Sequence, residues 1–224
     1  MGIGRREFIK QFGAALGALV TEGSGAVAIL DDLYVNRKLG IAFRKPAGWT
    51  FANAREMGEV QAGQILDLED KELARELVGS SEVPILTLSK ERLSAKAERF
   101  TPGITIFLDR FDALDVPEVS SDDPEFESDP LRALKVDIDS CGGVLRDFKV
   151  DSEPVEERVS DCDAAEYRSN FIFEHVGMQP TVVRMRSLSI AQRPAFYTLR
   201  MYDSLDEPDC EFDYTSFVDS IRMI

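Results

Sequence analysis

Four arginines lie on stretches of the chain that read as strands, and they are the side chains best suited to bind an anion. Arg184 and Arg186 are two residues apart, so strand alternation puts both on one face of a sheet. Arg168 and Arg200 lie on neighbouring predicted strands and join that face if the register suits. Because a guanidinium can hold a carboxylate through two parallel hydrogen bonds, this set predicts a site for a partner's carboxylate or a small anion. The alternative interpretation pairs these arginines with acids of the same domain: Glu166, Glu174 or acids of a helix.

Residues 137–143, DIDSCGG, have part of the pattern of a calcium loop. Asp137, Asp139 and Gly142 match its positions 1, 3 and 6. Cys141 stands at position 5 and Phe148 at position 12, where an acid must complete the coordination. The segment is therefore not predicted to bind calcium, and we assign no metal ligand and no cofactor.

Residues 203–213, DSLDEPDCEFD, form a second acidic group. Asp203, Asp206 and Asp209 are oxygen ligands of the kind that hard cations prefer. Their spacing matches no metal motif, so a solvated surface is the simpler interpretation. A metal-dependent hydrolase outside the cytoplasm, built on these acids, stays an alternative.

The cysteines and the single histidine form no recognisable catalytic set. Cys141, Cys162 and Cys210 are far apart and include no C-x-x-C motif. In an oxidising compartment Cys141 and Cys162 could form a disulfide, while buried, inert thiols are the simpler interpretation. His175 follows aromatic residues in strand alternation, so we expect it to be packed or at the rim of a sheet. No catalytic residue is predicted.

The composition is that of a globular protein with a strongly acidic surface. The 224 residues carry 41 Asp and Glu against 26 Lys and Arg, a formal net charge of −15. Such a field repels nucleic-acid backbones, so nucleic acid is not an expected partner. No window approaches the roughly 20 apolar residues of a membrane span, and we expect none in the mature chain.

The first 28 residues differ from the rest and have the three parts of a secretory signal. Arg5, Arg6 and Lys10 supply a basic start, residues 12–20 are weakly apolar, and Ala26 and Ala28 form a small-x-small cleavage site. Residues 4–10, GRREFIK with Phe8 after the arginine pair, resemble a twin-arginine (Tat) export signal. The alternative is an ordinary amphipathic first helix. We predict a signal peptide over 1–28 and one domain over 29–224, located in the periplasm or elsewhere outside the cytoplasm, the thylakoid lumen included.

Hydrophobic periodicity predicts mixed secondary structure in the mature chain. Helices are expected at 69–78, from Asp129 to about Cys141 where Gly142 and Gly143 would close or break the helix, and at 212–222. The last of these is expected to turn Phe212, with later apolar residues, toward the sheet. The expected strands are 33–35, 40–44, 49–51, 83–91, 103–111, 165–175, 181–190 and 195–202. Residues 29–224 are therefore predicted to fold as one α+β domain with a mainly antiparallel sheet.

Segments at both ends of this domain resemble the PsbP-like family. They are YVN (34–36), LGIAFRKPAGW (39–49), AFYTL (195–199) and FVDSI (217–221). The resemblance implies a single α/β/α sandwich with helices on both faces of a mainly antiparallel central sheet. It also implies an accessory or binding role outside the cytoplasm.

The predicted function is that of an exported, non-catalytic binding or accessory protein whose partner is an unknown protein or small ligand. The hydrolase above is one alternative. A cytoplasmic secretion chaperone, with residues 1–28 kept as a helix, is the other.

Overall fold

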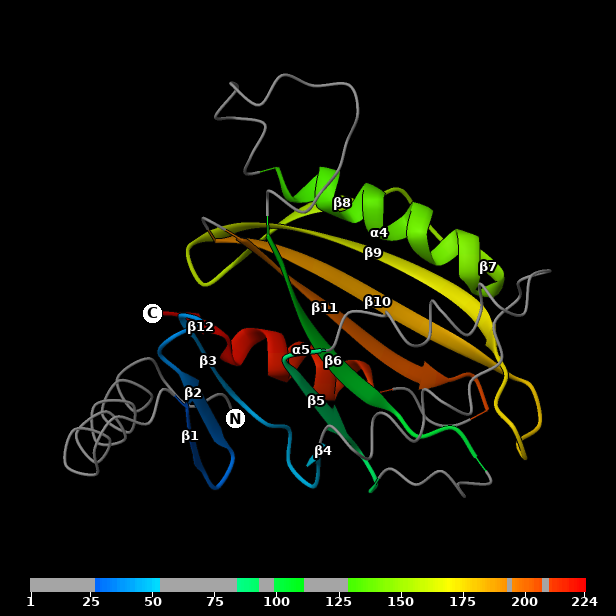
Figure 1. The fold of residues 1–224 in the computed structure, drawn as a ribbon, viewed down its shortest axis with the longest axis horizontal. Coiled ribbons are helices and arrows are strands. Elements are labelled where there is room, and N and C mark those ends of the chain that lie inside the picture. The colour runs from blue at the N-terminus through cyan, green and yellow to red at the C-terminus, as the bar shows by residue number, and fades with distance from the viewer. Residues whose placement is uncertain (1–26, 53–83, 93–98, 111–128, 193–194, 207–209) are drawn as a thin grey trace.

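The computed structural model describes residues 27–52, 84–92, 99–110, 129–192, 195–206 and 210–224. These residues form twelve strands and two helices (Figure 1). The strands are β1 (Val27–Leu30), β2 (Leu33–Asn36), β3 (Ile41–Arg44), β4 (Thr50–Ala52), β5 (Leu86–Ser89), β6 (Gly103–Arg110), β7 (Arg146–Val150), β8 (Val155–Val159), β9 (Cys162–Phe173), β10 (Thr181–Gln192), β11 (Ala195–Ser204) and β12 (Arg222–Met223). The helices are α4 (Pro130–Val144) and α5 (Glu211–Ser220).

The strands pair in two separate antiparallel sheets. A four-stranded sheet has the order β1-β2-β3-β12, and an eight-stranded sheet has the order β4-β5-β6-β11-β10-β9-β7 with β8 also paired to β9. The long strands β9, β10 and β11 form two successive hairpins. They confirm the strands predicted at 165–175, 181–190 and 195–202, each with slightly different ends.

Both faces of the long strands are buried, each against a different cover. Val183 and Met185 of β10 pack with Leu134 of α4, whereas Leu188 and Ile190 pack with the cluster around α5. Strand alternation explains the division, because successive side chains point to opposite faces. The eight-stranded sheet thus lies between two hydrophobic clusters.

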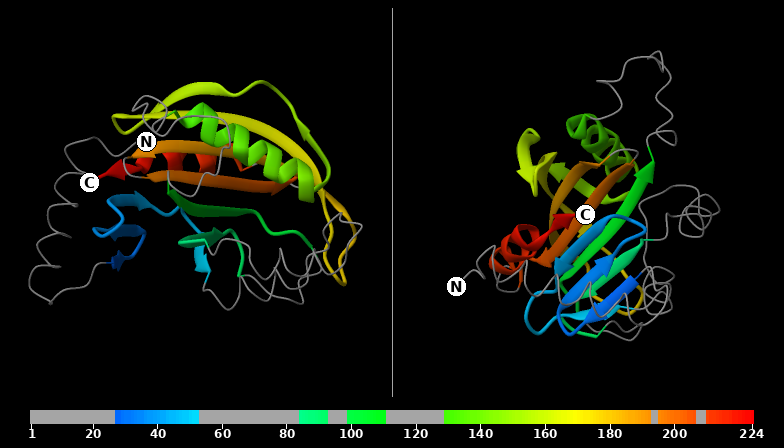
Figure 2. Two further views of the ribbon diagram at one scale, coloured as in Figure 1. Left: turned by 45° about the horizontal axis from the view of Figure 1, so that its top comes forward. Right: turned by 90° about the vertical axis from the view of Figure 1, so that its left-hand side faces the viewer.

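Helix α4 covers one face of the eight-stranded sheet (Figures 1 and 2). Asp129 caps it by accepting a hydrogen bond from the backbone N–H of Leu131 at 2.9 Å, and Pro130 fits the first turn. Gly142 and Gly143, where the helix was expected to close or break, lie inside α4, which ends one residue later at Val144.

The other face is covered by α5 together with the four-stranded sheet. Phe217 of α5 packs edge-on against Phe43 of β3, with ring centroids 5.0 Å apart. Tyr214 packs in the same way against Trp49 at 5.9 Å. Figure 2 shows α5 and the first strands of the chain on the side of the long strands away from α4.

The predicted single α/β/α sandwich with helices on both faces is wrong. The described residues are mostly strand and form two antiparallel sheets with two helices. The segments predicted as one central sheet separate because β2 and β3 pair with β1 and with the C-terminal β12 instead of with the long strands. A second sheet and one short helix therefore stand where a helical layer was expected.

Some predicted features lie outside the described residues, namely the leader up to residue 26 and the helix at 69–78. Among the residues that the structure does describe, neither helix has the length and apolar character that a membrane span needs.

Candidate functional site

The structure brings three of the four predicted arginines onto one face of the eight-stranded sheet. Arg186 of β10 is directly opposite Arg168 of β9 in the strand register, and Arg184 shares the face of Arg186. Arg200 of β11 is opposite Ser187, which places it on the other face. The register therefore divides the predicted set.

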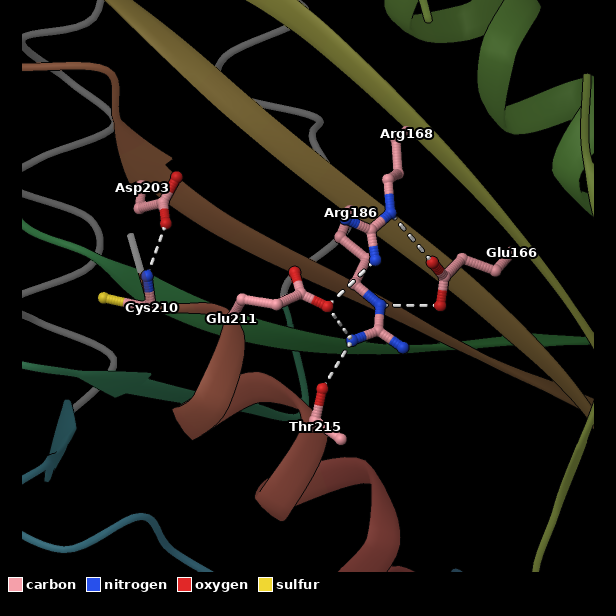
Figure 3. A network of polar contacts seen from close by, with 7 residues as sticks. All are labelled: Glu166, Arg168, Arg186, Asp203, Cys210, Glu211 and Thr215. Atoms are coloured by element: carbon pink, nitrogen blue, oxygen red, sulfur yellow. Dashed lines mark hydrogen bonds and ion pairs between the residues drawn. The ribbon is translucent and has the colours of Figure 1, made fainter. Parts of the chain in front are cut away.

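Arg168 and Arg186 form a polar network with two glutamates beside the start of α5 (Figure 3). Glu166 accepts hydrogen bonds from Arg186 Nε at 2.6 Å and from Arg168 Nε at 3.3 Å. Glu211 Oε1 accepts from Arg168 Nη2 at 2.9 Å and from Arg186 Nη1 at 3.2 Å. Arg186 Nη1 is also 3.4 Å from Thr215 Oγ1. Two guanidinium groups and two carboxylates thus balance one another, and we call these four charged residues the α5 network.

The α5 network has a buried half and an exposed half. The side chains of Glu166 and Arg186 are 10% and 15% exposed, whereas those of Glu211 and Arg168 are 44% and 51% exposed. Burial lowers the pKa of Arg168, but the carboxylates of Glu211 and Glu166 outweigh this effect and raise the pKa above its ordinary value. Arg168 is therefore a permanent cation at the surface.

Phe212 lies next to Glu211 in the first turn of α5 and is 81% exposed. The prediction that it packs toward the sheet is wrong. Tyr214 and Phe217 of the same helix are buried, and in the 3.6-residue helical repeat Phe212 falls on the side away from them. An exposed aromatic ring thus directly follows Glu211 of the α5 network in the first turn of the helix.

Arg184 is bound at the edge of this region by a different acid. Its Nε donates to Asp203 Oδ1 at 2.7 Å, and the other oxygen of Asp203 accepts from the backbone N–H of Cys210 at 2.8 Å. Asp203 is 3% exposed, so its carboxylate fixes the end of β11 to the start of α5. The prediction that Asp203 belongs to an acidic surface is wrong.

Arg200 belongs to a buried cluster under α4. Its Nε donates to Asp137 Oδ1 at 3.0 Å, and Asp137 Oδ2 accepts from Tyr167 at 2.7 Å and from Ser187 at 2.8 Å. The guanidinium carbon of Arg200 lies 4.9 Å from the centre of the Phe107 ring. Burial lowers the pKa of Arg200, but the Asp137 carboxylate raises it well above the ordinary value. The cluster connects α4 to the sheet through the Asp137 carboxylate, which binds side chains of β9, β10 and β11.

The segment that resembles a calcium loop is part of α4. Asp137 points into the cluster under the helix, and Asp139 is exposed. Asp206 is exposed too, and Asp209 lies outside the described residues. Within the described part of the chain, no three His, Cys, Asp or Glu side chains are grouped closely enough to hold a metal ion.

The three cysteines are free thiols. Cys141 packs in the cluster beneath α4, whereas Cys162 contacts the cluster on the other face, so the two are not joined. Burial raises the pKa of Cys141 to about 11. Burial also raises the pKa of Cys210, although the Lys90 ammonium, 3.4 Å from its sulfur, acts in the opposite direction.

His175 is packed, in agreement with the prediction. It is 6% exposed and stacks on Phe173 with ring centroids 6.2 Å apart. Its Nδ1 lies 2.9 Å from the backbone oxygen of Val176.

The predicted signal residues Arg5, Arg6, Phe8, Lys10 and Ala26 lie outside the described residues. Ala28 is the second residue of β1, where it is opposite Val35 of β2. The predicted cleavage site therefore falls within a paired strand.

Sequence reasoning did not single out Glu211 or Phe212 as parts of a site. Glu211 stood within an acidic run, and Phe212 matched an apolar pattern. The available signal was their position in the first turn of a helix that follows a strand bearing Asp203. Only the tertiary structure shows that this turn meets Arg168 and Arg186.

No family model matches the chain, and no curated protein matches it. Among solved structures, it is similar to the cyanobacterial PsbP protein CyanoP of Synechocystis sp. PCC 6803, with 14% identity, a TM-score of 0.46, and coverage of 91% of this chain and 99% of that one. It is also similar to LpqN of Mycobacterium tuberculosis, which is involved in cell envelope biogenesis, with 12% identity, a TM-score of 0.45, and coverage of 81% and 82%. Likeness this distant assigns neither a family nor an activity to the chain.

Proposed function

We propose that this chain is an exported, non-catalytic binding or accessory protein that contacts a protein partner through the surface at the start of α5. The observation that carries the proposal is Phe212, which is 81% exposed and directly follows Glu211, whose half-exposed side chain pairs with Arg168. An exposed ring is costly in water and contributes strongly to binding once a partner covers it. Aromatic residues and arginine are the side chains most enriched where partners bind tightly.

The surroundings of Phe212 support a rigid contact surface. Tyr214 and Phe217 anchor α5 in the core, and Asp203 fixes the backbone of Cys210 just before the helix. Phe212 and Glu211 are therefore presented from a helix that is held at its first turn and along its buried side. Pre-organisation of this kind lowers the entropy cost of binding.

Two features of the sequence support export. Residues 4–10 contain the arginine pair and the following Phe8 and Lys10 of a twin-arginine type signal. The rest of the chain is strongly acidic, so the basic leader differs from the body that it precedes. We therefore expect the proposed partner to lie outside the cytoplasm.

The experiment replaces Phe212 with a photo-crosslinking phenylalanine analogue in the full chain, expressed in its native host. We expect a cross-linked product of discrete mass that is lost when Arg168→Glu is added. The matched control carries the same analogue at Val176, a side chain 67% exposed at the turn after β9. Identical products from both positions, or none from position 212, would overturn the proposal.

A further inference from the structure

We infer that the Arg168–Arg186 pair is a carboxylate-binding site, and that Glu211 is its exchangeable internal occupant. This deepens the proposed function, because it states the chemistry of the group that the partner inserts beside Phe212. The ligand class is a carboxylate of a protein partner, either an Asp or Glu side chain or a chain terminus.

The site begins with two like charges held side by side. Arg168 and Arg186 are direct cross-strand partners, and like charges in such positions destabilise a sheet. Glu166 lies between them and bonds to the Nε of each, which compensates one charge. The pair still needs a second anion.

Glu211 supplies that anion with a single oxygen. Its Oε1 accepts from both guanidinium groups, at 2.9 Å from Arg168 and 3.2 Å from Arg186. Among the contacts of the described residues, Nη1 of Arg168 and Nη2 of Arg186 have no hydrogen-bond partner. Glu211 uses only one of its oxygens, so the two guanidinium groups retain N–H donors for a carboxylate that binds through both of its oxygens.

The two glutamates differ in how easily they can leave. Glu166 is 10% exposed and projects from the sheet, so removing it would leave Arg186, which is 15% exposed, without its closest acid. Glu211 is 44% exposed and stands in the first turn of α5. The helix dipole stabilises a carboxylate there even when it has left the arginines. Displacing Glu211 from the arginines therefore costs less free energy than displacing Glu166.

The test measures the binding of malonate, a small dicarboxylate, to the full chain labelled with ¹⁵N-arginine. Binding is detected in NMR titrations from the chemical shifts of the arginine Nε–Hε signals. Glu211→Gln removes the internal competitor, and an exposed ion pair of this kind is weak. We therefore expect malonate to bind the variant about fivefold more tightly than the unmodified chain. The shifts should fall on Arg168 and Arg186.

Two controls separate the site from general charge effects. Asp213→Asn removes the same charge from the same turn of α5, but Asp213 contacts Trp49 and Lys90 instead of the arginine pair. Sodium chloride at equal ionic strength reports screening, and Arg158, whose side chain is 70% exposed, reports nonspecific binding.

Equal malonate affinity in Glu211→Gln and Asp213→Asn would overturn the inference, as would shifts that are no larger at Arg168 than at Arg158. Its failure is distinct from that of the proposed function. Cross-linking at Phe212 without malonate binding retains the partner surface and rejects the carboxylate site. Malonate binding without cross-linking retains the carboxylate site and rejects the partner surface at Phe212.

Discussion

Asp137 and Arg200 form an ion pair with a buried carboxylate, and this pair joins α4 to β11 across the covered face of the large sheet. The second oxygen of Asp137 is used by Tyr167 and Ser187, so the carboxylate is 5% exposed but fully hydrogen-bonded. A buried charge is tolerated only when it is paired in this way.

Replacing Asp137 by alanine should therefore destabilise the protein strongly. Arg200 would lose its acid, and two buried hydroxyls would lose their acceptor, so we expect the free energy of unfolding to fall by about 3–5 kcal/mol. Urea denaturation measures the change. Asp139→Ala is the matched control on the same helix, and it should cost less than about 0.5 kcal/mol because Asp139 is exposed. Equal losses in the two variants would contradict this role for Asp137.

Charge reversal should separate the buried and exposed arginines of the α5 network. Arg186→Glu puts a second acid against Glu166, which is 10% exposed, so we expect a loss of several kcal/mol or failure to fold. Arg168→Glu changes a side chain that is 51% exposed, and the loss should stay near 1 kcal/mol. Thermal melting of both variants tests this difference. A melting temperature for Arg186→Glu as high as that for Arg168→Glu would show that the burial of the arginine does not determine the loss of stability.

The Cys141 thiol should make the stability fall in alkaline solution. Burial raises its pKa from the ordinary 9.0 to about 11 in the folded chain, so the unfolded chain loses this proton first as the pH rises. The contribution of the neutral thiol is complete below about pH 9 and is lost as the pH rises through 11. A difference of two pKa units corresponds to about 2–3 kcal/mol.

Urea denaturation across this pH range measures the effect, with Cys141→Ala as the comparison. The stability of the unmodified chain should fall more steeply than that of the variant. Parallel curves would show that Cys141 does not contribute.

Export should depend on both leading arginines. Replacing Arg5 and Arg6 together by lysine keeps the charge but removes the residue pair that the twin-arginine pattern requires. A reporter enzyme fused behind Ala28 should then stay in the cytoplasm, whereas the unmodified leader should carry it out. Unchanged export of the lysine variant would reject the twin-arginine assignment. Retention of both fusions would reject the leader itself.

The sequence predicted the long strands well because their signal is local. Residues 165–175, 181–190 and 195–202 are long runs rich in β-branched, aromatic and other apolar residues, bounded by turn residues such as Gly177, Pro180 and Pro194, and the structure confirms a strand in each. Strands β7 and β8 were not predicted, since RDFKV and VEERV each contain only two apolar residues among charged ones. The two-residue β12 is too short to give any pattern.

Pairing and register were beyond the reach of the sequence because they depend on contacts between distant segments. From the sequence, Arg168 and Arg200 are equally good candidates to share a face with Arg186. The register shows that Arg168 is opposite Arg186, whereas Arg200 is opposite Ser187. Asp203 illustrates the same limit, because its burial depends on Arg184 and on the backbone of Cys210. Residue type indicated which interactions these side chains can make, but their actual partners depend on the tertiary structure.

Ala28 lies within β1, so cleavage at the predicted site would change a paired strand. If a peptidase cuts behind Ala28, Val27 and Ala28 leave with the leader, and only Ile29 and Leu30 remain opposite Tyr34 and Leu33 of β2. The precursor and the processed protein would then differ in the number of β1 residues that pair with β2. Removal of the leader would therefore also remove two residues of the folded domain. For recombinant work, the choice of first residue would decide which of these two edges is studied.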